Sequence, residues 1–209
     1  MLIIGCCQAS AVRHHGDITI DTVALFSKAS QATADIASNV TESQLSSATP
    51  CSEFDVKSLA NHLAGFFGMS AMAARKQTLT GEPGADIVGS DPAGGIPGMI
   101  QGAVAAWQEP GSTEGKTQFG PGEYDAGFAA TITLFETVMH GWDLAKGTGQ
   151  ELQVSDDVGE AIFYIAQQIC NDDSRGEGNR FGPEINVSAD ASAFEKALGL
   201  SGRDPNWPA

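Results

Sequence analysis

The chain has 209 residues, and its 42% of hydrophobic residues is enough for the core of one globular domain. A formal net charge of -15 at pH 7 argues against binding to nucleic-acid phosphates or to an anionic membrane surface. The apolar segment 1–7 is too short for a membrane-spanning helix or an ordinary signal peptide. These observations predict a cytoplasmic protein whose partner is a small-molecule substrate, with a homodimer as an open alternative to a monomer.

The four cysteines of the chain are too sparse for a disulfide-bonded scaffold and show no Cys-x-x-Cys spacing. They are Cys6, Cys7, Cys51 and Cys170. We expect reduced thiols, and we assign no role to the adjacent pair Cys6 and Cys7, because a terminus without a recognisable element is commonly irregular.

Apolar residues recur three or four positions apart in several segments, which is the spacing of one helix face. The expected helices cover Asp17–Val40, Asp55–Thr78, Met99–Glu109, Phe128–Gly147 and Ser155–Ile169, and a short amphipathic piece follows at Ala193–Leu200. Asp17 or Thr19 is expected to cap the first helix. The segments 81–98 and 111–122 are rich in glycine and are expected to be loops, and no segment alternates convincingly like a strand.

This pattern predicts one all-α domain. We expect an irregular leader over residues 1–16, a single helical domain over 17–209, and a tail within that domain from about residue 172. No second core is indicated, because no linker or internal repeat divides the helical segments.

Two of the four histidines fall inside expected helices. These are His62 and His140, whereas His14 and His15 lie in the leader. Glu136 precedes His140 by four positions, and residues at i and i+4 share a helix face, so that a carboxylate and an imidazole can converge on one point. Such a pair is usually an ordinary hydrogen-bonded pair, and a metal site needs a further ligand from another helix.

His62 is the candidate for that ligand, since helix bundles build metal sites from side chains on facing helices. Two imidazoles and one carboxylate suit a first-row divalent ion, and three protein ligands leave a coordination position open, as in catalytic zinc sites. A buried polar network of His62, Glu136 and His140 is the alternative, and the spacing alone does not separate the two.

Two blocks of the sequence resemble the DinB-like metal-binding proteins, in the branch that contains mycothiol-dependent maleylpyruvate isomerase. The first block is 49–63, which reads Thr-Pro-Cys-Ser-Glu-Phe-Asp-Val-Lys-Ser-Leu-Ala-Asn-His-Leu. The second, 134–145, contains the Glu-x-x-x-His-x-x-Asp-Leu pattern of that branch. Phe181-Gly182-Pro183 and the closing 202–205, Gly-Arg-Asp-Pro, resemble a small single-domain subfamily. The resemblance extends from about residue 17 to residue 205.

The resemblance implies a DinB-like four-helix bundle with an additional helix and an irregular C-terminal tail. It also implies a divalent metal, Zn²⁺ in first place with Ni²⁺ as the other candidate, held by His62, Glu136 and His140. Phe54 stands where relatives commonly have Trp, and we expect no counterpart of the isomerase's additional C-terminal domain.

The leading function hypothesis is a thiol-dependent transferase or isomerase that acts on a small electrophile, with mycothiol as the thiol that the resemblance suggests. The alternatives are a metal-dependent hydrolase and a non-catalytic module that binds a metal or small ligand.

Asp143 lies at i+3 from His140 and is expected to orient that histidine or to act as a general base, unless it only positions local backbone. Arg203 is a candidate to bind a substrate carboxylate or to fix a turn of the tail. Trp107 and Trp142 are expected in the core rather than in a ligand pocket.

Overall fold

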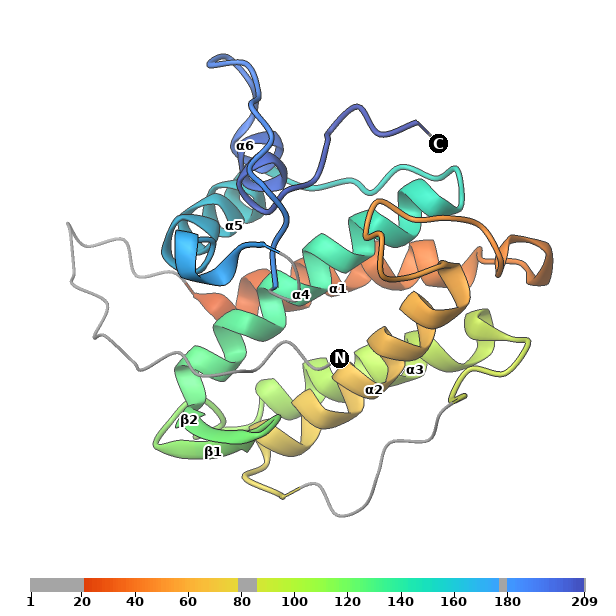
Figure 1. Cartoon of the computed structure of the whole chain (residues 1–209). Coiled ribbons are helices and arrows are strands. Elements are labelled where there is room, and N and C mark those ends of the chain that lie inside the picture. The colour runs from red at the N-terminus through yellow and green to blue at the C-terminus, as the bar shows by residue number, and fades with distance from the viewer. Residues whose placement is uncertain (1–20, 79–85, 177–179, 209) are drawn as a thin grey trace.

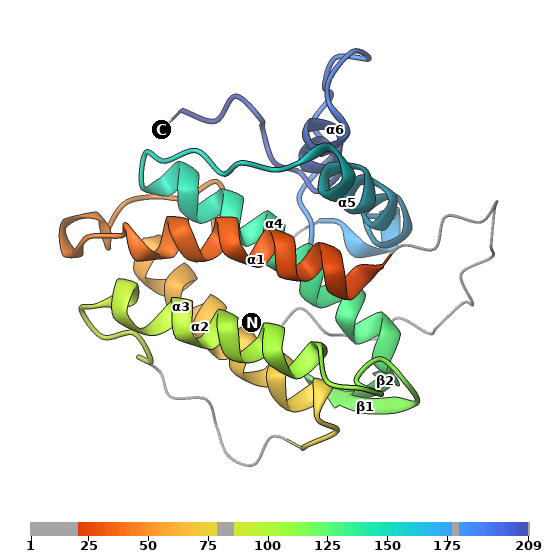
Figure 2. The same cartoon turned by 180° about the vertical axis from the view of Figure 1, so that it is seen from behind.

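Four long helices form the main body of the computed structural model, which describes residues 21–78, 86–176 and 180–208 (Figure 1). They are α1 (Thr22–Ser38), α2 (Val56–Ala74), α3 (Pro92–Trp107) and α4 (Ala126–Gly147). α1 packs against α3 and α4, and α2 packs against the same two helices, so α1 and α2 occupy opposite corners of the bundle. Figure 2 shows α1 and α3 together on the opposite side of the molecule. The predicted all-α four-helix bundle is confirmed.

Smaller elements complete the described part of the chain. They are the 3₁₀ turns η1 (Glu42–Gln44) and η2 (Asp172–Ser174), the strands β1 (Lys116–Phe119) and β2 (Gly122–Asp125), and the helices α5 (Asp156–Ile169) and α6 (Ala193–Leu200). α5 and α6 pack on each other, and α5 also contacts α4 (Figure 1). Among the described residues no helix combines the length and the apolar character that crossing a bilayer requires.

Short polar residues start the bundle helices. Asp21 accepts a hydrogen bond from the amide of Ala24 at the start of α1, and Asp55 accepts one from the amide of Ser58 at the start of α2. These caps satisfy amides that have no partner within the helix. The expected start at Asp17 and the alternative cap Thr19 lie outside the described residues.

The third helix begins seven residues earlier than we expected from the sequence. Asp91 caps it by accepting from the amide of Gly94, and Pro92 occupies its first turn, where a missing N–H costs no hydrogen bond. The helix continues through Pro97, and its Ile96 and Ile100 are fully buried. The glycines and prolines that indicated a loop are therefore overridden by burial of these apolar side chains.

A β-hairpin occupies the second segment that we expected to be a loop. β1 and β2 pair antiparallel, with Phe119 opposite Gly122, and Gly120 supplies the positive φ of 59° that the tight turn requires. The Thr117 hydroxyl donates to the carbonyl of Ala73 and Phe119 is buried, so the hairpin closes one end of the bundle. Strands of four residues are too short to show a clear alternation in the sequence.

α2 ends at Ala74, four residues before the expected end. Lys76 adopts a left-handed conformation with φ of 58°, and the amide of Gln77 donates back to the carbonyl of Met72. This is the pattern by which glycine commonly ends a helix, and the sequence offered no glycine there as a cue.

α4 is the most deeply buried element, and it is buried without interruption from Thr133 to Ala145. A chain of buried hydrogen bonds ties it to two neighbours. The indole N–H of Trp107 on α3 donates to the Ser70 hydroxyl on α2, which lies 2.9 Å from the Thr133 hydroxyl on α4. These three polar side chains are therefore paired with one another within the core, as most buried polar groups are.

The close approach of α1 and α4 at Gly141 gives a testable prediction. A Cβ at Gly141 would overlap with the buried Thr33 side chain, whose hydroxyl donates to the carbonyl of Thr137. Gly141→Ala should therefore lower the free energy of unfolding by about 1–3 kcal/mol through overpacking, measured by urea denaturation.

Gly68 provides a matched control on α2. It is exposed, and no atom outside its own helix lies within 4 Å of the place where a Cβ would stand. Gly68→Ala should raise stability by up to about 1 kcal/mol, because alanine is the better helix former. Equal stability of the two variants would contradict the packing described here.

Candidate metal centre

Three ionisable side chains lie along one side of α4. Glu136, His140 and Asp143 follow one another at helical spacing, and none of them is more than 6% exposed. Each is on the helix that the bundle covers most completely, so these groups are held in a fixed, nearly dry environment. Burial of this kind is costly for charged groups unless they are paired with one another or with an ion.

α2 brings His62 to the same place. Its Nε2 lies 3.5 Å from Oε2 of Glu136, and Nε2 of His140 lies 3.3 Å from that same oxygen. The ring centroids of the two histidines are 4.9 Å apart. Residues 74 positions apart in the chain are therefore brought together at the face where α2 and α4 meet.

These distances are long for hydrogen bonds and are also compatible with three ligands of one metal ion. Both exceed the usual 2.7–3.2 Å of an N–H···O hydrogen bond. Ligands at about 2.0–2.1 Å from a tetrahedral Zn²⁺ are separated from each other by about 3.3 Å. One ligand atom from each of His62, Glu136 and His140 lies within 4.8 Å of the others. The donor set of two imidazole nitrogens and one carboxylate oxygen suits a first-row divalent ion.

The other nitrogen of His140 is held by Asp143. Its Nδ1 lies 2.9 Å from Oδ2 of Asp143, whose carboxylate also accepts two hydrogen bonds from Arg203, at 2.9 Å from Nε and at 2.7 Å from Nη2. Asp143 is fully buried. A carboxylate on the outer nitrogen of a histidine orients the ring so that its Nε2 faces a metal.

Burial and charge act in opposite directions on these groups. Burial alone would raise the pKa of Glu136, but hydrogen bonds and charge from His140 and His62 hold it well below its usual range. Burial would lower the pKa of His140, yet Asp143 and Glu136 raise it to about 9. At pH 7 the metal-free His140 is therefore protonated, and a cation that binds there has to displace this proton.

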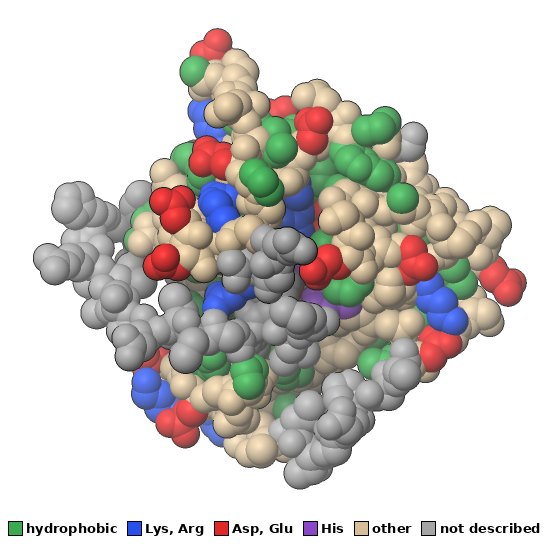
Figure 3. Space-filling model, in the orientation of Figure 1, with side chains coloured by type: hydrophobic (Ala, Val, Ile, Leu, Met, Phe, Trp, Pro, Cys, Tyr) green, Lys and Arg blue, Asp and Glu red, His purple; other side chains and the backbone are tan. Residues whose placement is uncertain are grey.

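An aromatic side chain and a short loop cover the two histidines. Phe54 stacks on His62 with ring centroids 5.1 Å apart and meets His140 edge-on at 6.1 Å. The Thr49 hydroxyl donates to the carbonyls of Cys51 and Phe54, which fixes the loop that precedes α2. The side chain of His62 is 10% exposed. A small histidine surface is visible near the middle of the face that Figure 3 shows.

Cys51 is a neighbour of the centre that the sequence did not indicate. A ligand atom from each of Cys51, His140 and Asp143 lies within 4.8 Å of the others. Burial raises the pKa of the Cys51 thiol to about 11, and the negative charge of Asp143 adds to this, although Arg203 opposes it. The thiol is therefore protonated at neutral pH and is a poor nucleophile.

The structure thus brings together all four residues that the sequence singled out, His62, Glu136, His140 and Asp143. His14, His15, Cys6 and Cys7 lie outside the described residues. Trp107 and Trp142 are buried in the core, as expected.

Three further residues contact this group. Phe54 and Cys51 carry no chemical pattern of their own, and only their place in the block 49–63 could have indicated them. Arg203 was considered for a substrate carboxylate or for a turn, whereas in the structure its guanidinium is bound to Asp143.

Residues 26–145 match the model of the mycothiol maleylpyruvate isomerase N-terminal domain. This match covers more than half of the chain and includes His62, Glu136, His140 and Asp143. The chain belongs to this family. The DinB-like resemblance of the sequence is thereby confirmed.

Two relatives come from Mycobacterium tuberculosis, the uncharacterized protein MT0763 of strain CDC 1551 / Oshkosh and the uncharacterized protein Rv0738 of strain ATCC 25618 / H37Rv. Each is 25% identical to this chain over 169 residues, which cover 79% of this chain and 88% of the relative. No solved structure gave a significant match. The relatives therefore extend the similarity beyond residues 26–145 without adding an activity.

The raised pKa of Cys51 gives a prediction for its reactivity. At pH 7.5 its alkylation by iodoacetamide in the native protein should be on the order of 100-fold slower than in the urea-unfolded chain, because only the thiolate reacts. The rate should rise about tenfold per pH unit until the pH approaches 11. Peptide mass spectrometry of the fragment that contains Cys51 measures this, and equal rates in both states would contradict the protonated thiol.

Proposed function

We propose that this protein binds one divalent metal ion through His62, Glu136 and His140, and that it is a thiol-dependent transferase or isomerase that acts on a small electrophilic molecule. Zn²⁺ is the proposed metal, with Ni²⁺ as the alternative, and mycothiol is the proposed thiol. The observation that carries the proposal is the pair of 3.3 and 3.5 Å separations around Oε2 of Glu136, which match the spacing of ligands around one ion.

The role proposed for each residue follows from its contacts. His62 and His140 supply nitrogen ligands from facing helices, and Glu136 supplies the anionic one. Asp143 orients His140, and this role is favoured over that of a general base because its two oxygens are already engaged by Arg203 and His140 and are shielded from solvent. A metal held by these three side chains would supply a Lewis acid that lowers the pKa of a thiol reaching it.

Two observations support an external thiol. The first is that the family takes its name from a mycothiol maleylpyruvate isomerase. The second is that Cys51, the one cysteine beside the centre among the described residues, has a pKa raised to about 11. The protein's own thiol is therefore unsuited to attack an electrophile at neutral pH. In the proposed reaction the external thiol gives its proton to solvent and its sulfur forms a bond to the electrophilic carbon. The electron pair of the π bond at that carbon, or of the bond to a leaving group, moves away at the same time. In an isomerase the C–S bond then breaks again, the double bond re-forms and the thiol takes a proton back from solvent.

Metal content tests the ligand set. The purified protein should contain about one Zn²⁺ or Ni²⁺ per chain, measured by elemental analysis after dialysis. His62→Ala and His140→Ala should each lose most of this metal, and Glu136→Gln should bind it more weakly because the anionic ligand is gone.

His14→Ala and His15→Ala are the matched controls, since they remove the other two imidazoles of the chain. Both should keep the metal content of the parent protein. The same metal content in all five variants would contradict the proposed ligand set.

Turnover with and without a thiol tests the reaction class. A panel of small electrophiles is offered to the metal-loaded protein with mycothiol, with another low-molecular-weight thiol, and with none. Conversion should require both metal and thiol, and His140→Ala should abolish it. Metal-dependent hydrolysis without any thiol would support the hydrolase instead, and stoichiometric binding without conversion would support a non-catalytic module.

A further inference from the structure

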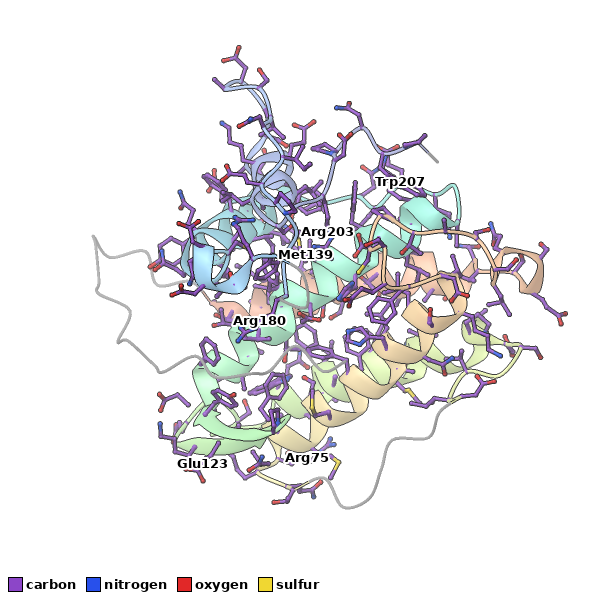
Figure 4. The ribbon with its side chains drawn as sticks, viewed as in Figure 1. Arg75, Glu123, Met139, Arg180, Arg203 and Trp207 are labelled. Carbon is purple, nitrogen blue, oxygen red and sulfur yellow. The ribbon has the colours of Figure 1, made fainter. Side chains whose placement is uncertain are left out.

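Arg203 reaches the metal centre from the far end of the described chain. Figure 4 shows it extending from the segment after α6 toward α4. Its guanidinium contacts Asp143, which lies 60 positions earlier in the sequence, and its side chain is only 11% exposed. A buried arginine needs a partner for its charge, and here that partner is the carboxylate that holds His140.

The end of α6 directs Arg203 to this place. The amide of Gly202 donates to the carbonyl of Gly199, and the amide of Arg203 donates to the carbonyl of Leu198. With Gly202 at a positive φ of 82°, these two bonds form the glycine-containing motif that commonly ends a helix. The backbone conformation at Arg203 is thus fixed by local hydrogen bonds, which do not depend on the contact that its side chain makes with Asp143.

The contact with Asp143 has two points. Nε donates to Oδ1 and Nη2 donates to Oδ2, so the planar guanidinium and the carboxylate face each other as a matched pair. A carboxylate that was bonded to His140 alone could turn about its last single bond. The two-point contact removes this freedom, and Oδ2 then stands in a defined position 2.9 Å from Nδ1 of His140.

We propose that Arg203 is a positioning residue of the metal centre, which fixes the Asp143 carboxylate so that this carboxylate fixes the His140 imidazole. The inference rests on the proposed metal site. It adds that the affinity and geometry of this site depend on a residue that touches neither the metal nor its ligands.

Anchoring of the tail is the structural alternative to this role, and another arginine provides an anchor that does not involve the centre. Arg175 donates to the backbone carbonyls of Cys170, Gly182 and Leu200, and so ties α5, α6 and the segment between them. None of these acceptors belongs to the centre. Arg175 is therefore the matched control for a purely structural role.

The experiment measures the Zn²⁺ affinity of metal-free protein by competition with a chromophoric chelator, and the visible spectrum after loading with Co²⁺. Circular dichroism and thermal melting give the folded fraction of each variant, to which both readouts are normalised. Arg203→Met should weaken Zn²⁺ binding about 10- to 100-fold and change the Co²⁺ bands. Arg175→Met should lower the melting temperature and leave both metal readouts unchanged.

Two further variants test whether Arg203 acts on the metal centre through Asp143. In an Asp143→Asn background, Arg203→Met should cause no further loss of affinity, because the residue through which it acts is already changed. Arg203→Lys keeps the charge but cannot contact both carboxylate oxygens in one plane, so it should lose most of the same affinity.

Three outcomes would overturn the inference while leaving the metal site in place. They are wild-type affinity and spectrum in Arg203→Met, wild-type affinity in Arg203→Lys, and a full additional loss in the Asp143→Asn background. Absence of Zn²⁺, Ni²⁺ and Co²⁺ binding in the parent protein would instead overturn the proposed function, and this inference with it.

Discussion

Asp143 is a fully buried carboxylate whose charge is balanced by Arg203 on one side and by His140 on the other. Burial favours the neutral acid, but the charge of Arg203 and the hydrogen bond with His140 keep the pKa of Asp143 low. This one group ties the segment after α6 to the bundle through Arg203, and it also contacts Nδ1 of His140. His140 in turn lies 3.3 Å from the Glu136 oxygen that His62 approaches to 3.5 Å.

The helix that carries these groups is enclosed on nearly every side. α1 covers it through the contact at Gly141, α2 faces it with His62, and α5 packs on a further side. A burial this complete normally excludes charge, and α4 contains two carboxylates and a histidine that pair with one another and with Arg203. The surrounding helices hold the three candidate ligand side chains close together, and of these His62 is the most exposed to solvent.

The features that could be predicted from the sequence are those that depend on the local spacing of residues. Glu136 and His140 share a helix face by periodicity alone, and the end of α4 at Gly147 agrees with the basic residue and glycine that indicated it. His62 could be joined to them only by a hypothesis about facing helices. The pairing of Asp143 with Arg203 has no local signature, and the early start of α3 and the hairpin depend on burial that short glycine-rich segments do not reveal.

The 60 positions between Asp143 and Arg203 also set an order of events during synthesis. A ribosome that adds about 5–20 residues per second delivers Arg203 roughly 3–12 s after Asp143, whereas collapse of a chain of this size takes microseconds. The four bundle helices, which end at Gly147, can therefore pack while the carboxylate has no arginine partner. A nascent chain would hold that carboxylate protonated or hydrated until the segment after α6 docks, so the charge buried in the bundle is balanced only by a residue that is made seconds later.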